Sequence, residues 1–300
     1  MRSDNGGEDR SKIKVRRPMP NKDQDSNNPK EEAERLLHCA YGESEPAKRL
    51  AFAKQALALS ADCADAYVLL AREGTEDLLE KIALYRKGVD AAERTLGPRA
   101  FERNVGHFWG ILEARPYLRA RFGLAETLWQ AGEHKEALEH YRVLLKLNPG
   151  DHQSVRYRLM LGLLTLKIDE AAETLLRRYE DEISVVWVYT AALVSFRRHG
   201  DTKAGCKLRD RAVQLFPKGA TFLLHRSRIP ADEALCFGLP AEHRDAIAYA
   251  REYGEFWDKT NGALSWLASK AEPERAAVAT STTRAINASD LLKIMSSDED

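Results

Sequence analysis

Apolar side chains recur three and four residues apart from Lys30 as far as about residue 217. Ala33, Leu36, Leu37 and Ala40 form the first such stripe. This spacing places side chains on one face of an α-helix. The pattern therefore predicts a series of amphipathic helices, with at most a minor β-hairpin.

The helical pattern also repeats along the chain. The residues that recur after 34 positions, or twice 34, are Gly132 and Gly200, Pro149 and Pro217, and Ala137 and Ala171. A period of 34 residues is typical of helix–turn–helix units that stack side by side. Three units are in phase, at 118–149, 152–183 and 186–217. The sequence predicts an all-α, right-handed α-solenoid.

Composition divides the chain into a body and two tails. Residues 1–29 are polar and rich in Asn, Asp and Lys, and residues 271–300 carry 6 acidic and 3 basic groups. Both have too few large apolar groups to offset the entropy of ordering, so we expect disordered tails. The expected parts are a 1–29 tail, helical repeats over 30–217 with an irregular insertion at 97–117, a helical cap over 218–270, and a 271–300 acidic tail.

The cap follows from the open end of the array. A solenoid must cover the apolar face of its last unit, because that surface otherwise aggregates. The apolar residues available for this are Ala246, Ile247, Ala250, Phe256, Trp257, Leu264, Trp266 and Leu267. We therefore expect the last helices to fold back on the third regular pair.

Charge and cysteine usage narrow the class of protein. The 46 basic and 46 acidic residues balance, and the four cysteines stand singly without ligand spacing to a histidine. The longest apolar run, Ile183 to Val194, has 12 residues, whereas a membrane helix needs about 20. We expect a cytoplasmic protein with no membrane contact, no metal and no cofactor.

The segment 118–149 resembles the tetratricopeptide family. The residues in that family's typical places are Leu124-Ala125, Leu128, Gly132, Ala137, Tyr141, Leu144 and Pro149. The next pair departs from the pattern, since Leu166 stands where the turn glycine is expected. The resemblance implies a concave binding surface built from the first helix of each pair.

A narrower resemblance covers about residues 30–270. The segments that carry it are Tyr189-Thr190-Ala191-Ala192-Leu193, Arg211-Ala212-Val213, Thr221-Phe222-Leu223-Leu224, Asp245 to Ala250, Trp257, and Gly262-Ala263-Leu264. In order and spacing they resemble the suppressor-of-tumorigenicity-7 family. Animal members carry membrane segments, which have no counterpart here, so their localisation does not transfer. The family has no established catalytic residues, which implies that this chain is not an enzyme.

The main hypothesis is a protein–protein interaction scaffold that binds a peptide or helical segment in the concave groove. Aromatic and arginine side chains typically dominate such interfaces. The residues expected on the groove are Arg119, Phe122, Glu126, Trp129, Arg156, Tyr157, Met160, Thr190 and Arg197. The alternative for the apolar and aromatic members is that they form contacts between helices.

Two other hypotheses remain open. In the insertion, His107, Glu113 and Arg115 could form an enzyme active site or an anion site, although a separation of six does not place His107 and Glu113 on one helical face. A nucleic-acid interface could use arginines on successive helices: Arg115, Arg119, Arg121, Arg156 and Arg158. The neutral overall charge disfavours this third reading.

Overall fold

A computed structural model describes residues 28–231 and 239–271. Regular structure in these stretches is entirely helical. The bounds are α1 Pro29–Gly42, α2 Pro46–Leu59, α3 Ala64–Glu73, α4 Leu78–Leu96, α5 Pro98–Arg103, η1 Phe108–Gly110, η2 Leu112–Ala114, α6 Arg115–Gln130, α7 His134–Leu147, α8 Val155–Thr165, α9 Asp169–Arg178, α10 Val185–His199, α11 Lys203–Leu215, α12 Pro217–Leu224, η3 Arg226–Arg228 and α13 Ala241–Asp258. Residues 263–271 are also helical.

The two expected tails lie almost entirely outside the described residues. At the N-terminal edge, helix α1 begins at Pro29, and the Asn28 side chain accepts a hydrogen bond from the Lys30 amide at 3.2 Å. At the C-terminal edge, Ala271 is helical and buried. Residues 29 and 271, just outside the expected 30–270, are thus helical.

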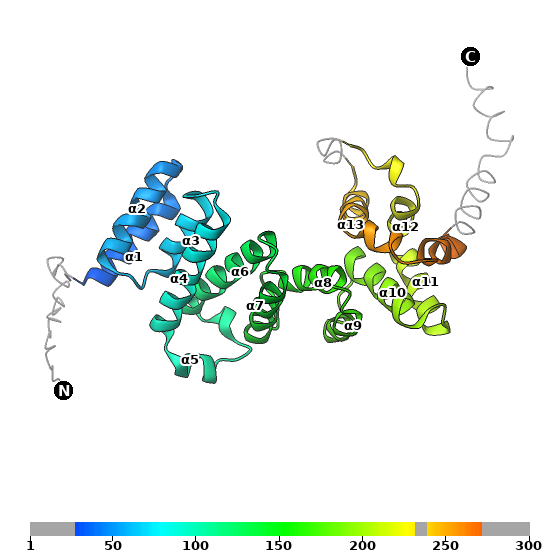
Figure 1. The fold of residues 1–300 in the computed structure, drawn as a ribbon, viewed down its shortest axis with the longest axis horizontal. Coiled ribbons are helices and arrows are strands. Elements are labelled where there is room, and N and C mark those ends of the chain that lie inside the picture. The colour runs from blue at the N-terminus through cyan, green and yellow to red at the C-terminus, as the bar shows by residue number, and fades with distance from the viewer. Residues whose placement is uncertain (1–27, 232–238, 272–300) are drawn as a thin grey trace, which may run out of the picture.

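The helices stack as pairs in an elongated row (Figure 1). The pairs are α1 with α2, α3 with α4, α6 with α7, α8 with α9, and α10 with α11. This is the all-α solenoid that the sequence predicts. We call the first helices α3, α6, α8 and α10 the inner row, because the concave face of such arrays is lined by the first helix of each unit.

The repeated glycines and prolines end helices at equivalent places. Gly132 follows α6 with φ 85°, and Gly200 follows α10 with φ 70°. Both angles lie in the region that side chains other than glycine rarely adopt. Pro149 and Pro217 each stand two residues after the last residue of a helix, α7 and α11. The turns that the sequence places between helices are confirmed.

The middle pair does not keep the expected phase. Its turn residue with positive φ is Lys167, at 57°, which is one position later than the expected Leu166. The buried alanine equivalent to Ala137 is likewise Ala172, whereas Ala171 is half-buried. The match of Ala137 with Ala171 at 34 residues is therefore wrong by one residue.

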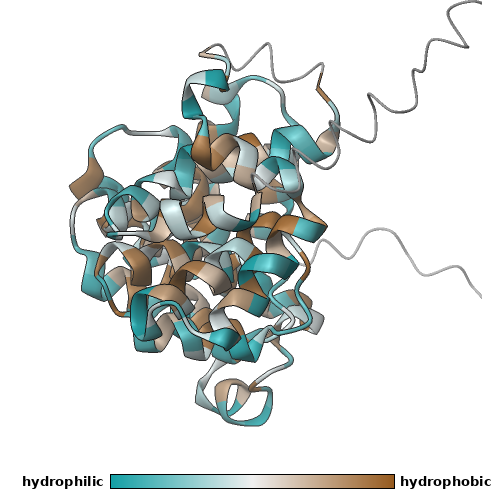
Figure 2. Cartoon of the chain, turned by 90° about the vertical axis from the view of Figure 1, so that its right-hand side faces the viewer, coloured by the Kyte–Doolittle hydropathy of each residue, from teal (hydrophilic) through white to brown (hydrophobic). Residues whose placement is uncertain are grey.

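The core runs through the whole stack. Figure 2 shows hydrophobic residues on the faces that helices turn toward one another and hydrophilic residues outside. The largest fully buried side chains of the core are Trp257, Tyr117, Tyr141, Tyr189, Tyr249 and Tyr253. Three of these six lie in α13. The C-terminal helix is thus a full part of the core.

The C-terminal helices cover the third regular pair, as the sequence predicts. Trp266 packs on Phe196 of α10 with ring centroids 4.7 Å apart, and its Nε1 donates to Asp201 at 2.9 Å. Helix α13 contacts α12 and α10, and it reaches further, to α8. The cap therefore extends along the inner row beyond the end of the array.

His140 of α7 provides a test of the fold through pH. Burial and the nearby Arg121 lower the pKa of His140 below its ordinary value, against the opposing effect of Glu136. The folded state keeps this histidine neutral at pH values where the unfolded chain takes up a proton, so stability is lost as pH falls below the ordinary value. We expect the free energy of unfolding to fall between pH 7 and pH 5.5, and to fall less in His140→Gln. Urea titrations at both pH values, with the exposed His38→Gln as control, measure this; an equal pH slope in both variants would contradict it.

Candidate partner-binding groove

Helix α13 covers the inner row at α8 and α10. Its Tyr253 Oη donates to the Tyr157 carbonyl at 3.4 Å, and its Tyr249 Oη lies 3.4 Å from the Thr190 hydroxyl. Glu252 forms an ion pair with Arg158 at 3.6 Å. Figure 1 shows α13 and α9 on opposite sides of α8. This part of the expected concave groove is occupied by the chain itself.

Two of the expected groove residues are consequently buried. Met160 and Thr190 each have 0% exposed surface. Tyr249 of α13 lies beside Thr190, and Met160 belongs to the core of the stack. Fully buried side chains offer no surface to a partner, so the structure does not place these two residues on an open groove.

Three other expected groove residues make contacts with α9 or the loop after it. Arg197 pairs with Asp169 at the start of α9, at 3.1 Å. The guanidinium of Arg156 and the hydroxyl of Tyr157 both bind the Glu182 carboxylate, at 2.6 and 3.0 Å. These side chains join α8 and α10 to the α9 side of the array. All three side chains are half-buried and engaged in contacts within the protein.

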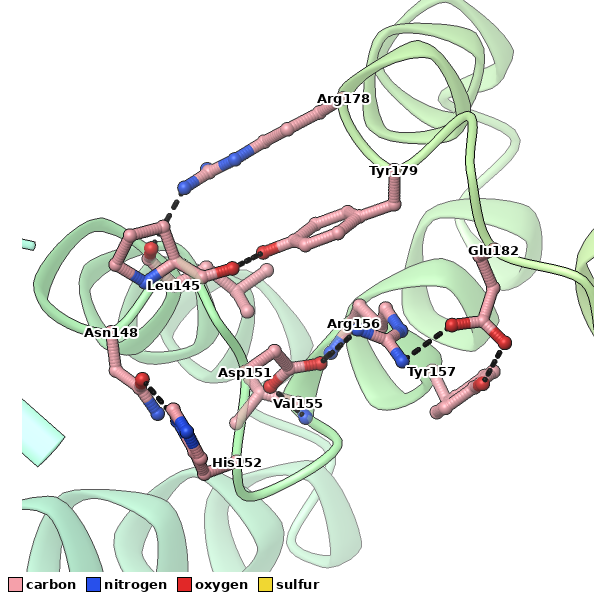
Figure 3. A network of polar contacts seen from close by, with 11 residues as sticks. Leu145, Asn148, Asp151, His152, Val155, Arg156, Tyr157, Arg178, Tyr179 and Glu182 are labelled. Atoms are coloured by element: carbon pink, nitrogen blue, oxygen red, sulfur yellow. Dashed lines mark hydrogen bonds and ion pairs between the residues drawn. The ribbon is translucent and has the colours of Figure 1, made fainter.

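Arg156 belongs to the polar network drawn in Figure 3. At its centre the buried Asp151 carboxylate accepts hydrogen bonds from the amides of Val155 and Arg156, at 2.6 and 3.0 Å. It thus caps the N-terminus of α8. Burial raises the pKa of Asp151, although these hydrogen bonds and the Arg156 charge oppose the shift. The network fixes the position of α8 and carries no open binding surface.

Trp129 lies between helix pairs. Its ring stacks on His134 of α7 with centroids 4.2 Å apart. A Cβ added to Gly162 of α8 would lie 3.1 Å from the Trp129 ring and 2.5 Å from Leu138. Only glycine permits this approach of α8 to the preceding pair. The half-buried Trp129 thus makes contacts between helices, the alternative to its expected place on the groove.

The remaining three expected residues line an open cavity of about 400 Å³ in the N-terminal part of the inner row. We call it the N-terminal groove. Its lining from α6 includes Arg119, Phe122 and Glu126. The other residues of the lining are Val68, Ala71, Arg72, Lys81, Tyr85, Gly123, Thr127, Gln130 and Gln153. The sequence thus identified one wall of this site.

Cations predominate among the charged residues of the N-terminal groove. Arg119 Nε donates to Asp65 at 2.9 Å, and Lys81 pairs with Glu76 at 2.8 Å. Arg72 is exposed and forms no ion pair within the described residues. Glu126, the one carboxylate of the lining, is bound by Arg158 at 3.3 Å and by the hydroxyl of Tyr141. Arg72 and Lys81 were missed because neither interrupts the amphipathic pattern of its own helix.

The insertion does not assemble the proposed His107, Glu113 and Arg115 site. His107 and Glu113 are exposed, and no contact described in the structure joins the three side chains. Arg115 Nε donates to the Trp109 carbonyl at 3.2 Å, and its guanidinium stacks over the Trp109 ring. The Trp109 ring also stacks on the His152 ring, with centroids 4.9 Å apart and an angle of 5° between the ring planes. The histidine beside Trp109 is therefore His152 and not His107.

The insertion instead contains a structural cluster of aromatic rings. The Phe101 ring lies 5.0 Å from both Phe108 and Tyr117. Phe108 and Tyr117 are fully buried. These contacts fix the short helices α5 and η1 against the start of α6. Anchoring of an irregular loop explains its aromatic content without a catalytic role.

The five arginines of the nucleic-acid hypothesis all have partners within the protein. Their contacts are Arg115 with Trp109, Arg119 with Asp65, Arg121 with Tyr117 and Glu93, Arg156 with Glu182, and Arg158 with Glu126 and Glu252. Four of the five are paired with carboxylates, so they do not form the uncompensated basic surface that phosphate binding requires. Within residues 28–231 and 239–271, no helix is both long and apolar enough to cross a membrane. The same residues hold no group of three or more His, Cys, Asp or Glu side chains suited to a metal ion.

Comparison with known proteins places these features in a family. The sequence model of the family described as ST7 protein matches residues 21–278. "Protein ST7 homolog" of Drosophila melanogaster is 27% identical over 269 residues, which cover 79% of this chain and 48% of that protein. "Suppressor of tumorigenicity 7 protein-like" of Bos taurus is 28% identical over 255 residues, 77% of this chain and 45% of that protein. This chain spans about half the length of these relatives.

YrrB, a TPR protein with an unusual peptide-binding site, matches with a TM-score of 0.40 and 19% identity, over 61% of this chain and 82% of that chain. The family match, in contrast, extends over most of the sequence and includes the whole described body. The chain belongs to the ST7 protein family.

Proposed function

We propose that this chain is a non-enzymatic scaffold that binds a peptide or helical segment of a partner protein in the N-terminal groove. The proposal rests on one observation. Helix α13 fills the inner row at α8 and α10, whereas the part of the row at α3 and α6 contains an open cavity of about 400 Å³. A groove lined by the first helices of stacked pairs is the surface on which such arrays bind extended or helical segments.

The side chains of the N-terminal groove suit an acidic segment. Arg72 supplies an unpaired positive charge near the half-buried Phe122 ring, and the paired Lys81 and Arg119 also line the groove. An aromatic anchor beside arginines is a typical centre of binding energy. Asp65 already fixes the Arg119 guanidinium, which reduces the entropy lost when a ligand carboxylate binds there.

Charge reversal at Arg72 tests the proposal with little effect on the fold, because this side chain is exposed and makes no ion pair within the described residues. Arg72→Glu should weaken capture of a partner by about 2 kcal/mol or more, which is roughly 30-fold. Quantitative capture from native lysate, followed by mass spectrometry and repeated after nuclease treatment, measures this.

Arg99→Glu is the matched control, since Arg99 is exposed on α5 and outside the groove. Phe122→Ala should reduce capture of the same partner while circular dichroism confirms retained helix. Equal capture by Arg72→Glu, Phe122→Ala and Arg99→Glu would rule out this groove. Loss of capture on nuclease treatment would instead favour the nucleic-acid hypothesis.

A further inference from the structure

A second and larger cavity lies on the opposite side of the array from α13. Its volume is about 680 Å³, and α9, α10 and α11 supply most of its lining. Helix α10 forms the floor, with α9 and α11 as the two walls. We call it the α10 groove. None of the residues expected to bind a partner from the sequence lines this groove.

The α10 groove is open because its walls are not joined. One repeat earlier, α9 is tied to the α7 end by hydrogen bonds from Arg178 to the Leu145 carbonyl at 2.8 Å and from Tyr179 to the Pro149 carbonyl at 3.0 Å (Figure 3). Among the described residues no hydrogen bond or ion pair connects α9 with α11. The two walls are therefore tied together in the earlier repeat and not in the next.

The length and lining of the α10 groove suit a helix. The floor runs from Trp187 to His199, and the twelve steps of α-helix between these two residues rise about 18 Å, or some three turns. Leu176, Val188 and Leu208 supply apolar contacts along it. Trp187 is 3% exposed, and its indole Nε1 has no hydrogen-bond acceptor.

The α11 wall carries a row of unpaired positive charges. Lys203, Lys207 and Arg211 are spaced by four residues and lie along one side of the helix; all three are exposed, and none forms an ion pair within the described residues. On the α9 wall, Glu173 is already neutralised by Arg198 and by Arg177 at 3.6 Å. Glu180, just after α9, is exposed and also lines the groove, so the uncompensated positive charge beside the groove lies on the α11 side.

We propose that the α10 groove binds an amphipathic helix from a partner protein, with its apolar face on α10 and an acidic edge facing α11. A helix in this position completes a four-helix arrangement with α9, α10 and α11, and its carboxylates pair with Lys207 and Arg211. The charge pattern selects the partner's orientation, and the apolar floor supplies most of the affinity. This site is separate from the N-terminal groove and does not depend on it.

Two designed peptides provide the probe. Both are fluorescein-labelled helices of about four turns with leucine at positions i, i+3, i+4 and i+7; one carries glutamate along an edge of that stripe and the other carries lysine. Fluorescence anisotropy with the full chain should show binding of the glutamate peptide and at least tenfold weaker binding of the lysine peptide. The double variant Lys207→Glu/Arg211→Glu should bind the glutamate peptide at least tenfold more weakly. Lys54→Glu/Lys87→Glu, the same charge change on exposed sites elsewhere, should leave its affinity unchanged.

A blocking variant separates the groove from general charge attraction. Ala204 is exposed and lines the groove, so Ala204→Trp should fill it without disturbing the core and abolish binding of the glutamate peptide. Phe122→Ala, in the N-terminal groove, should leave that binding unchanged. Equal binding of both peptides, or normal binding to Ala204→Trp, overturns the proposal.

Two other occupants give distinct results. If light scattering shows a dimer of the full chain that becomes a monomer in Ala204→Trp, a second copy fills the groove and the partner helix is wrong. If the glutamate peptide binds only after Asp298→Asn/Glu299→Gln/Asp300→Asn, the acidic end of this chain is the occupant, and the assignment to a partner protein is again overturned.

Discussion

Replacement of Trp257 by alanine is expected to lower the free energy of unfolding by about 3–5 kcal/mol, the cost of removing a large buried aromatic side chain. Trp257 has 0% exposed surface, and its Nε1 donates to the Tyr249 hydroxyl at 3.0 Å. The substitution leaves a cavity in α13 and deprives a buried hydroxyl of one partner. Guanidinium chloride unfolding, followed by circular dichroism, measures the change.

The conservative variant Trp257→Phe serves as the control, because it keeps a ring in the cavity and loses only the indole N–H. It should cost clearly less than Trp257→Ala. A loss below about 1 kcal/mol for Trp257→Ala would be typical of a surface site, and would contradict the docking of α13 on α8 and α10. In that case the inner row would be open over its full length.

Asp151→Ala should have the second largest effect, about 2–4 kcal/mol. The change removes the acceptor of the Val155 and Arg156 amides and one carboxylate beside the Arg156 guanidinium. It also places alanine at φ 51°, a backbone angle that alanine adopts with strain. Thermal and urea unfolding should both register the loss.

Asp151→Asn is the matched control for this prediction. Asparagine tolerates the left-handed conformation and keeps one oxygen acceptor, so one of the two cap hydrogen bonds survives. Burial raises the pKa of Asp151, which means that the stability this group contributes is present at low pH and is lost as pH rises through the folded-state value. The neutral amide does not undergo this loss, and Asp151→Asn should therefore be far closer to wild type than Asp151→Ala. Equal destabilisation by both would show that the cap is unimportant.

The turns and the helical architecture were predictable because they depend on local chemistry. Gly132 and Gly200 are required by positive φ angles, and Pro149 cannot continue a helix. Such features involve residues close together in the chain, so their spacing alone contains the information.

The surface lining was only partly predictable, because it depends on contacts between distant segments. Periodicity places Thr190 on the inner side of α10, but nothing in the pattern shows that Tyr249, 59 residues later, covers it. The same applies to Trp129, whose neighbour Gly162 admits its ring between two pairs. The shift of one residue at Lys167 could not be seen in the sequence, because Gly132 and Gly200, on either side of it, are separated by twice the 34-residue period.

The positive charge of Arg158 is shared between carboxylates in the two parts of the inner row. It lies 3.3 Å from Glu126, in the N-terminal groove, and 3.6 Å from Glu252, in α13. A ligand carboxylate that competes with Glu126 for this guanidinium changes the attraction that holds α13. By thermodynamic linkage, any factor by which such a ligand alters the docking of α13 is also the factor by which docking alters the affinity for that ligand. Ligand binding in the N-terminal groove and docking of α13 are then coupled equilibria.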